Sequence, residues 1–288
     1  MNSYVIFTDS ACDINAEILK SWGVRYTSLT FRFDGSEKEY ANDEMEAKDF
    51  YDRMRAGGIA KTAAINVDGF AQAFEKILQE GKDVLYLGFS SGLSTTYNSA
   101  RLAVEGLRER YPDRKLMAVD TLAASAGMGL LVYLASQKQQ SGASMEEVVH
   151  YVNALIPKIC HWFTVDDLVY LKRGGRVSAA AAFVGGVLGI KPVMHVDNEG
   201  HLVPVAKVRG RRTSIAAMAQ KYGELAETPG KGTIFISHGD CMGDVELLAG
   251  MLKEQYGAEI QIITDVGPVI GAHSGPGTLA LFFIGKEK

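Results

Sequence analysis

Apolar and polar residues alternate in blocks along the first half of the chain, and these blocks predict strands and helices in turn. Short apolar runs with the length of buried strands occur at Tyr4–Thr8, Val24–Phe33, Val84–Leu87 and Leu116–Val119. Helical spacing of apolar residues, or a capping residue before them, predicts helices at Asn15–Trp22, Phe70–Leu78, Thr95–Arg110, Ser125–Gln140 and from Ser144 towards Ile156. Repeated strand–loop–helix units of this kind predict a doubly wound, mostly parallel α/β sheet.

The second half of the chain has a different pattern. Lys191–Val196 and His201–Val208 flank Asp197-Asn198-Glu199-Gly200, which predicts a β-hairpin. Three more strands and two helices are predicted at Thr233–Ser237, Ile260–Val266, Thr278–Ile284, Ser214–Leu225 and Asp244–Tyr256. This mixture favours an α+β domain. We therefore expect two domains, residues 1–160 and 161–288, packed together without a linker and with a ligand site at their interface.

The segment Gly267–Gly277, between the last two predicted strands, holds four Gly, two Pro and one His. Glycine permits positive φ and close backbone approach, and proline fixes φ. We expect a stiff, ordered turn that holds His273 at the edge of a cavity. A tight surface loop with an exposed histidine is the alternative.

Composition and charge narrow the class of protein. The chain has 288 residues, of which 47% are hydrophobic and 22% charged, as in soluble globular proteins. A net charge of −4 argues against a nucleic-acid partner. Cys12, Cys160 and Cys241 form no C-x-x-C pair, which disfavours a zinc site and fits a reducing cytoplasm. No signal peptide is expected, and the most apolar stretch, Val177–Ile190, is shorter than the ~20 residues of a transmembrane helix. No nucleotide or metal motif is present, so neither a cofactor nor a metal is expected.

Gly88-Phe89-Ser90-Ser91-Gly92 follows a predicted strand and matches the nucleophile-elbow pattern G-x-S-x-G. His273 and Asp265 lie later in the chain and could complete a hydrolase triad with Ser90. In a true elbow the helix begins directly after the serine, whereas here Ser94 has the position of the helix cap. The delayed helix leaves hydroxyl and amide groups at its positive end, which favours a carboxylate or phosphate site. A turn with a cap and no ligand is the remaining interpretation.

Other polar clusters have a functional and a plain interpretation. Asp9 and Asp13 follow the first strand and could bind a metal or act as an acid–base pair, but we favour Asp13 or Asn15 as a helix cap. The basic, glycine-rich segment Leu171–Val177, predicted to be a turn before an Ala-rich helix, could neutralise an anion or dock a partner. The same holds for a second basic cluster at Lys207, Arg209, Arg211 and Arg212. Solvated basic surfaces are the plain alternative.

Five motifs, in order along nearly the whole chain, resemble those of the DegV family. They are Thr8-Asp9-Ser10, Ser90-Ser91-Gly92-Leu93-Ser94-x-Thr96-Tyr97, Val119-Asp120-Thr121, Leu171–Val177 and Gly267-Pro268-x-x-Gly271-x-His273-x-Gly275-Pro276-Gly277. The resemblance implies a two-domain α/β protein that buries a long-chain fatty acid. It further implies the binding subunit of a bacterial fatty-acid kinase system (FakB type), which is not itself an enzyme. Such a subunit presents the acyl carboxylate to a separate ATP-dependent kinase and carries the acyl phosphate to phospholipid synthesis.

The resemblance also implies a set of binding residues. Thr62 and Ser94 are expected to bind the fatty-acid carboxylate, with Arg209 and His273 close to the same head group. The chain departs from the family at Ala63-Ala64-Ile65-Asn66, where Ser-Gln-Pro-Ser is usual, and at Thr95, where Gly is usual. These changes could alter the pocket entrance or the docking of the partner.

Physical chemistry is compatible with such a ligand. Burying ~14 methylenes at ~0.8 kcal/mol each would contribute roughly 11 kcal/mol before the ordering cost of binding. A buried carboxylate needs several hydrogen-bond donors. Met128, Leu131 and Phe183 are candidate contacts for the tail, with ordinary core packing as the alternative. Two other functions stay open: a serine hydrolase using Ser90 and His273, and a sensor of a small anionic metabolite.

Overall fold

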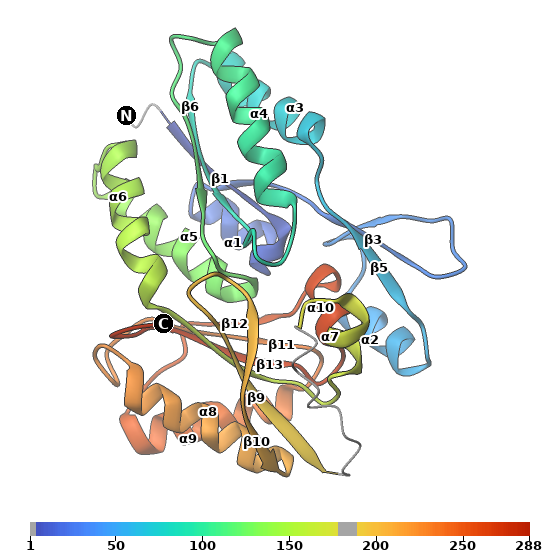
Figure 1. Cartoon of the computed structure of the whole chain (residues 1–288). Helices are drawn as coiled ribbons and strands as arrows, with labels where there is room; N and C mark the ends of the chain where they lie inside the picture. The colour runs from blue at the N-terminus through green and yellow to red at the C-terminus, as the bar shows by residue number, and fades with distance from the viewer. Residues whose placement is uncertain (1–3, 178–188) are drawn as a thin grey trace.

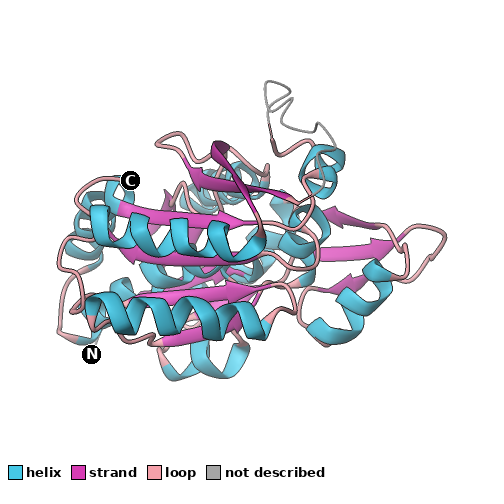
Figure 2. Ribbon diagram, turned by 90° about the horizontal axis from the view of Figure 1, so that it is seen from below, coloured by secondary structure: helices cyan, strands magenta, loops and turns pink. Residues whose placement is uncertain are grey.

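The computed structural model describes residues 4–177 and 189–288. Two sheets lie one above the other, with helices between them and on their outer sides, and a third, small sheet projects from one side (Figures 1 and 2). The strands of the upper sheet come from the first half of the chain and those of the lower sheet from the second. The expected combination of a parallel sheet and a second, mixed sheet is confirmed.

The upper sheet has four parallel strands in the order β2-β1-β6-β7. The strands are β1 (Tyr4–Asp9), β2 (Arg25–Thr27), β6 (Asp83–Gly88) and β7 (Leu116–Asp120). The helices are α1 (Ala16–Ser21), α3 (Val67–Gln79), α4 (Thr96–Arg110), α5 (Ser125–Gln140) and α6 (Met145–Leu155). Each of these strands ends at the edge that faces the lower sheet, which is where ligands approach parallel sheets.

Helix α5 lies between the two sheets (Figure 1), and its first two turns are buried on all sides. Two glycines, Gly127 and Gly129, make this close packing possible. A Cβ on Gly127 would lie 2.3 Å from His161 Nε2 of the lower sheet, and one on Gly129 would lie 2.5 Å from Ile14 of the upper domain. Met128, which lies between the two glycines, and Leu131, which follows them, are fully buried in the core.

The predicted strand Val24–Phe33 is wrong as a single element. The chain forms β2, turns at Ser28 and Leu29, and continues as β3 (Thr30–Phe33) in the small sheet. There β3 pairs with β4 (Tyr40–Ala41) and β5 (Ala60–Ala63), and α2 (Ala47–Arg55) packs beside them. The turn is fixed by a hydrogen bond from Leu29 N to Ser10 Oγ at 2.9 Å, a non-local contact that strand periodicity does not reveal.

The lower sheet has six strands in the order β10-β9-β8-β13-β11-β12. The strands are β8 (Ile159–Thr164), β9 (Ile190–Val196), β10 (Leu202–Arg209), β11 (Ile234–His238), β12 (Ile262–Asp265) and β13 (Leu279–Ile284). Neighbours are antiparallel except β11 and β12, and the predicted hairpin is formed by β9 and β10. Helices α8 (Arg211–Leu225) and α9 (Met242–Tyr256) cover the face away from α5.

Two glycine-rich segments expected to be turns contain short helices instead. Within Gly267–Gly277 the chain forms α10 (Pro268–Ser274), with a proline at its start and Gly275, at φ +83°, directly after its end. This proline-first, glycine-last arrangement is a helix signal that the high glycine content concealed. Leu171–Val177 likewise contains the end of α7 (Val169–Gly174). The Ala-rich helix expected after it falls largely outside the described residues, as does Phe183.

Candidate functional site

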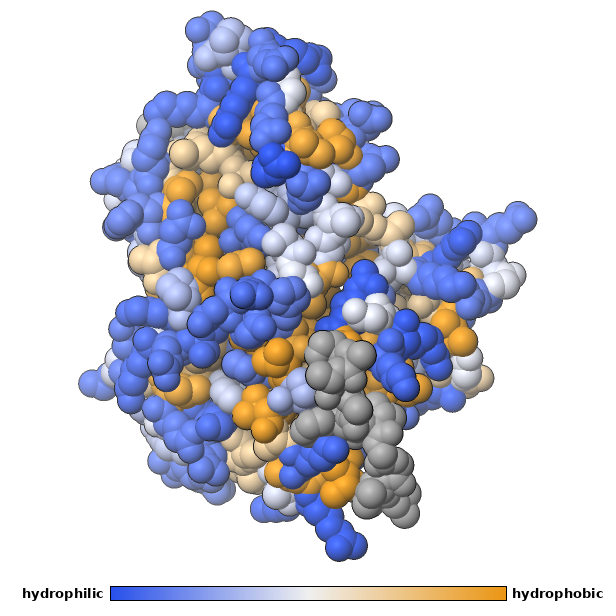
Figure 3. Space-filling model, in the orientation of Figure 1, coloured by the Kyte–Doolittle hydropathy of each residue, from blue (hydrophilic) through white to orange (hydrophobic). Residues whose placement is uncertain are grey.

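A cavity of about 730 Å³ is lined by residues from both the first and the second half of the chain. Its walls come from the loop before α4, from β5, α7 and α10, and from the inner faces of β8 and β13. Apolar side chains form much of the lining, among them Phe163, Val269 and Phe282. Figure 3, in the orientation of Figure 1, shows apolar residues (orange) at the surface between the upper and lower parts of the molecule. The size and lining are those of a site for an organic ligand.

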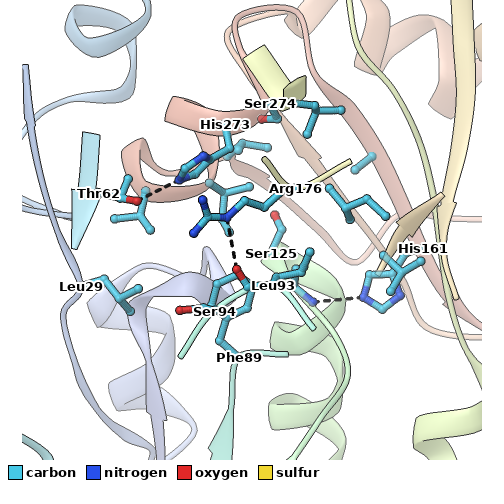
Figure 4. A pocket seen from close by; sticks show the side chains of 18 of the residues that line it. Leu29, Thr62, Phe89, Leu93, Ser94, Ser125, His161, Arg176, His273 and Ser274 are labelled. Carbon is cyan, nitrogen blue, oxygen red and sulfur yellow. Dashed lines mark hydrogen bonds between the residues drawn. The ribbon is translucent and has the colours of Figure 1, made fainter. Parts of the chain in front are cut away.

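Three of the four expected head-group residues meet at this cavity. Thr62 comes from β5, Ser94 from the loop before α4 and His273 from α10. Thr62 Oγ1 lies 2.8 Å from His273 Nε2, and Ser94 Oγ lies 2.8 Å from Thr96 Oγ1. These partly exposed side chains, together with Arg176 on the neighbouring loop, form what we call the mouth of the cavity (Figure 4).

Arg209 does not belong to this group. It is exposed at the end of β10, opposite Ile190, and is not among the described residues that line the cavity. Arg176 supplies the guanidinium instead: its Nε donates to Leu93 O at 3.3 Å and another nitrogen donates to Gly174 O. The sequence singles out the basic segment Leu171–Val177, but only the fold shows that Arg176 points between Ser94 and His273 (Figure 4).

His273 is neutral at physiological pH. Burial, and secondarily the charge of Arg176, lower its pKa to about 4. With the proton on Nε2, the ring donates to Thr62 Oγ1, and the Thr62 hydroxyl is then free to donate to an anion. Among the described residues Nδ1 has no hydrogen-bond partner, and it faces Gly174, where a Cβ would come within 2.2 Å of it. Glycine at 174 is therefore required for this position of the imidazole.

Helix α10, which carries His273, is held by residues of the first domain. Gly267 N donates to Asp13 Oδ1 at 3.0 Å, and Val269 N donates to Asn42 Oδ1 at 2.7 Å. The hydroxyl of Tyr51 donates to Val266 O at 2.7 Å. The position of His273 thus depends on contact between the two halves of the chain.

The two acidic residues after β1 have separate structural partners. Asp9 accepts hydrogen bonds from Ala11 N, the Tyr86 hydroxyl and Phe89 N at 3.0, 2.6 and 3.1 Å. Asp13 accepts from Gly267 N and the Ser125 hydroxyl. Burial raises the pKa of Asp9 to about 6 and that of Asp13 to about 7.

Of the two caps proposed for the next helix, Asn15 is the one formed, with Ile18 N donating to its side chain at 2.8 Å. In the part of the chain that the structure describes, no group of three or more His, Cys, Asp or Glu side chains is arranged to hold a metal.

Two of the three expected tail contacts, Met128 and Leu131, are not at the cavity wall, and the third, Phe183, lies outside the described residues. Met128 and Leu131 are core residues and do not line the cavity, and α5 contributes Ser125 instead, with Ala124 just before it. The inner wall includes His161, whose Nδ1 lies 3.1 Å from Ile159 O and whose Nε2 accepts from Ala124 N at 3.4 Å. Burial lowers the pKa of His161 to about 3.

The hydrolase interpretation has no geometric support. Ser90 is fully buried and donates to Gly200 O at 2.9 Å. His273 is bonded to Thr62 rather than to Ser90, and Asp265 lies 3.6 Å from a different histidine, His238. The three residues therefore form no triad.

No helix within residues 4–177 or 189–288 is long and apolar enough to cross a membrane.

Comparisons with known proteins cover the whole chain. The model of the family described as "Uncharacterised protein, DegV family" matches residues 3–286. A DegV domain-containing protein of Clostridium perfringens is 43% identical over 289 residues, covering 100% of this chain and 99% of the relative. A DegV lipid-binding protein of Thermotoga maritima has a similar structure, with a TM-score of 0.87, 32% identity and 100% of both chains covered. A fatty-acid-binding DegV family protein of Thermus thermophilus gives a TM-score of 0.89 at 28% identity, covering 98% of this chain and 99% of the other.

Proposed function

This chain belongs to the DegV family, and on that premise we propose that it binds a long-chain fatty acid and presents it to a separate fatty-acid kinase. The observation that carries the proposal is the interdomain cavity, which combines an apolar wall with hydroxyl, imidazole and guanidinium groups at its mouth. Its volume and its apolar lining favour a lipid over a small anionic metabolite. Relatives of the same fold bind lipid or fatty acid.

The carboxylate of the acid is proposed to lie at the mouth. The hydroxyls of Thr62 and Ser94 are proposed to donate to it. Thr62 does so with the proton of His273 on Nε2, where it points to the Thr62 oxygen, and Ser94 does so with the Thr96 hydroxyl as donor to the Ser94 oxygen. Arg176 contributes positive charge nearby. A carboxylate bonded by several donors, one of them charged, avoids the penalty of burying an anion without partners.

The acyl chain is proposed to run from the mouth along the apolar wall formed by residues such as Phe163, Val269 and Phe282. Each buried methylene contributes about 0.8 kcal/mol, so the tail supplies the larger part of the affinity and the head group supplies orientation. No cofactor of the chain's own is required for binding.

In the proposed reaction, the partner kinase transfers the γ-phosphoryl group of ATP to a carboxylate oxygen, which yields an acyl phosphate and ADP. The carboxylate must therefore stay within reach of a second protein, and the partly exposed mouth meets this need. Arg209 is exposed on β10 and is proposed to contact the kinase rather than the acid. The product would serve phospholipid synthesis, and the chain would act in the cytoplasm.

Binding is tested by mass spectrometry of the acid extracted from purified, denatured protein and by palmitate titration. Thr62→Val keeps the shape of the side chain and removes the hydroxyl, so affinity should fall about tenfold to hundredfold. Thr62→Ser keeps the hydroxyl and should bind within a few-fold of the wild type. Ser94→Ala and Ser94→Thr form the same matched pair. Absence of any bound lipid, and no uptake of added palmitate or oleate, would refute the proposal.

Presentation is tested separately, by following acyl-phosphate formation with ATP and a fatty-acid kinase subunit. Arg209→Ala should slow the reaction and leave palmitate affinity unchanged, because Arg209 lies away from the cavity. His273→Ala should lower both the rate of acyl-phosphate formation and the affinity for palmitate. Full turnover by both variants would exclude the assigned roles, and a loss of palmitate binding in Arg209→Ala would exclude its placement at the kinase interface.

A further inference from the structure

The interior of the cavity is more polar than an unbranched acyl chain needs. Five of the side chains that line it are polar and at most 6% exposed: Ser125, His161, Ser237, Ser274 and Thr278. We call these five the interior polar group. Hydrocarbon gains nothing from such groups, and each of them needs a hydrogen-bond partner of its own.

Most of the interior polar group is already satisfied. The Thr278 hydroxyl donates to Gly275 O at 2.7 Å. The Ser125 hydroxyl donates to Asp13, so the 2.9 Å contact between Ser125 and Ser237 uses the proton of Ser237. When Asp13 is ionised, the Ser237 hydroxyl therefore has no proton left for a ligand, and its oxygen can only accept a hydrogen bond from one. His161 Nε2 is also an acceptor, with only the long contact from Ala124 N.

Ser274 is the exception. Its side-chain oxygen is buried and has no hydrogen-bond partner among the described residues, so both its proton and its lone pairs are available. It follows His273 directly on α10, which places it next to the mouth (Figure 4). A buried hydroxyl left without a partner is unfavourable, and water or a polar atom of the ligand must satisfy it.

We propose that Ser274 recognises a hydroxyl group near the carboxyl end of the bound chain, so that the cavity prefers a long-chain hydroxy acid to the unsubstituted acid of the same length. This inference rests on the proposed fatty-acid binding. A methylene group at this position displaces water from Ser274 and replaces none of its hydrogen bonds. A hydroxyl accepts from Ser274, and the oxygen of Ser237, which also lines the cavity, can accept its proton.

The test compares three acids by calorimetric titration: palmitate, 3-hydroxypalmitate and 16-hydroxypalmitate. The wild-type protein should bind 3-hydroxypalmitate about tenfold more tightly than palmitate, because one buried hydroxyl gains a partner. The acid with its hydroxyl at the far end should bind no better than palmitate. Ser274→Ala should abolish the preference, because palmitate no longer leaves a buried hydroxyl without a partner and binds more tightly, whereas 3-hydroxypalmitate loses the partner of its own hydroxyl and binds more weakly.

Ser136→Ala is the matched control, since Ser136 is a buried serine on α5 that donates to Trp22 O at 2.8 Å and does not line the cavity. It should keep the full preference. Equal binding of palmitate and 3-hydroxypalmitate by the wild type, or a preference that survives in Ser274→Ala, overturns the inference and leaves fatty-acid binding intact. If none of the three acids binds, the proposed function fails and the inference fails with it.

Discussion

The loop that carries Ser94 and the helix that carries His273 meet at the mouth of one cavity, but they are fixed by different parts of the molecule. The loop follows β6, and Phe89 N and Ser91 N bond to Asp9 and Asp120 of the same domain. Helix α10 belongs to the second half of the chain, and its first amides bond to Asp13 and Asn42 of the other domain. Asp9 and Asp13, only four residues apart in sequence, thus hold the Ser94 loop and helix α10, respectively.

This difference bears on how the site forms. The loop of Ser94 is fixed by Asp9 and Asp120 from its own half of the chain, and two further bonds join it to the second half, from Ser90 to Gly200 O and from Arg176 to Leu93 O. The bond between Thr62 and His273 requires that α10 be docked on the first domain. Carboxylate binding should therefore depend on domain contact through His273 more than through Ser94.

The largest effect is expected for Asp13→Ala. The substitution leaves Gly267 N and the Ser125 hydroxyl without their acceptor, which should lower the free energy of unfolding by about 3 kcal/mol. Asp9→Ala should cost a similar amount, because it removes the acceptor of three buried donors. The two variants should differ in the nitrogen NMR signals of the His273 ring, which only Asp13→Ala should shift. Equal shifts in both variants would contradict the separate anchoring of the two segments.

A smaller effect is expected for Asn42→Ala, which removes the acceptor of Val269 N but leaves Asp13 in place. The free energy of unfolding should fall by about 1–2 kcal/mol, with a weaker displacement of the His273 signals than in Asp13→Ala. Asn15→Ala is the control, because it removes a side-chain cap of the same kind from α1, away from the cavity, at a cost of about 1 kcal/mol. His273 signals that move in the control as much as in Asn42→Ala would argue against a specific role for Asn42.

The ionisation of Asp13 makes the anchoring of helix α10 depend on pH. Its pKa is raised to about 7 in the folded protein, chiefly by burial and further by the nearby Asp265 and Asp9. Because the folded state binds the proton more tightly than the unfolded state, the contribution of Asp13 to stability is greatest at low pH and is lost as the pH rises through 7. Asp13→Asn cannot ionise, and its amide can still bond to Ser125 and Gly267.

Between about pH 4 and pH 7 the folded state holds the Asp13 proton and the unfolded state does not, so over this range urea unfolding should show a shallower decline in Asp13→Asn than in the wild type. The expected difference is up to about 1.4 kcal/mol per pH unit. His161 and His273, whose pKa values are lowered, affect stability as the pH falls below about 6.5, but both proteins contain them, so their effect cancels in the comparison. Parallel pH curves for the two proteins would show that Asp13 does not titrate there.

Local patterns predicted much of the fold because their causes are local. Helix α5 spans Ser125–Gln140 as predicted from its apolar content, and both hydrogen bonds of the capping box between Ser144 and Glu147 are formed. The β9–β10 hairpin follows from the turn residues between its strands. In each case the residues that determine the element are also part of it.

The features that the sequence did not predict depend on residues far away in the chain. The break after β2 depends on Ser10, and α10 depends on Asp13 and Asn42, which lie more than 220 residues away in sequence. The choice between Arg176 and Arg209 likewise depends on which backbone approaches Ser94 and His273. The motifs of the chain indicate Thr62, Ser94 and His273 by resemblance, but they do not reveal the distant contacts that position these side chains.

The smallest effect is expected for Ser90→Ala, which removes the bond from the loop to Gly200 O across the domain interface. The loss of this single neutral hydrogen bond should lower the free energy of unfolding by about 1 kcal/mol. Palmitate affinity should change less than twofold, because the contacts of Phe89 and Ser91 still fix the loop. The wild-type protein should not react with a fluorophosphonate probe, since Ser90 is buried and its hydroxyl is bonded to a backbone carbonyl rather than to a histidine. Labelling at Ser90 would favour the hydrolase interpretation, whereas a collapse of binding in Ser90→Ala would mean that the loop, like α10, depends on the other half of the chain.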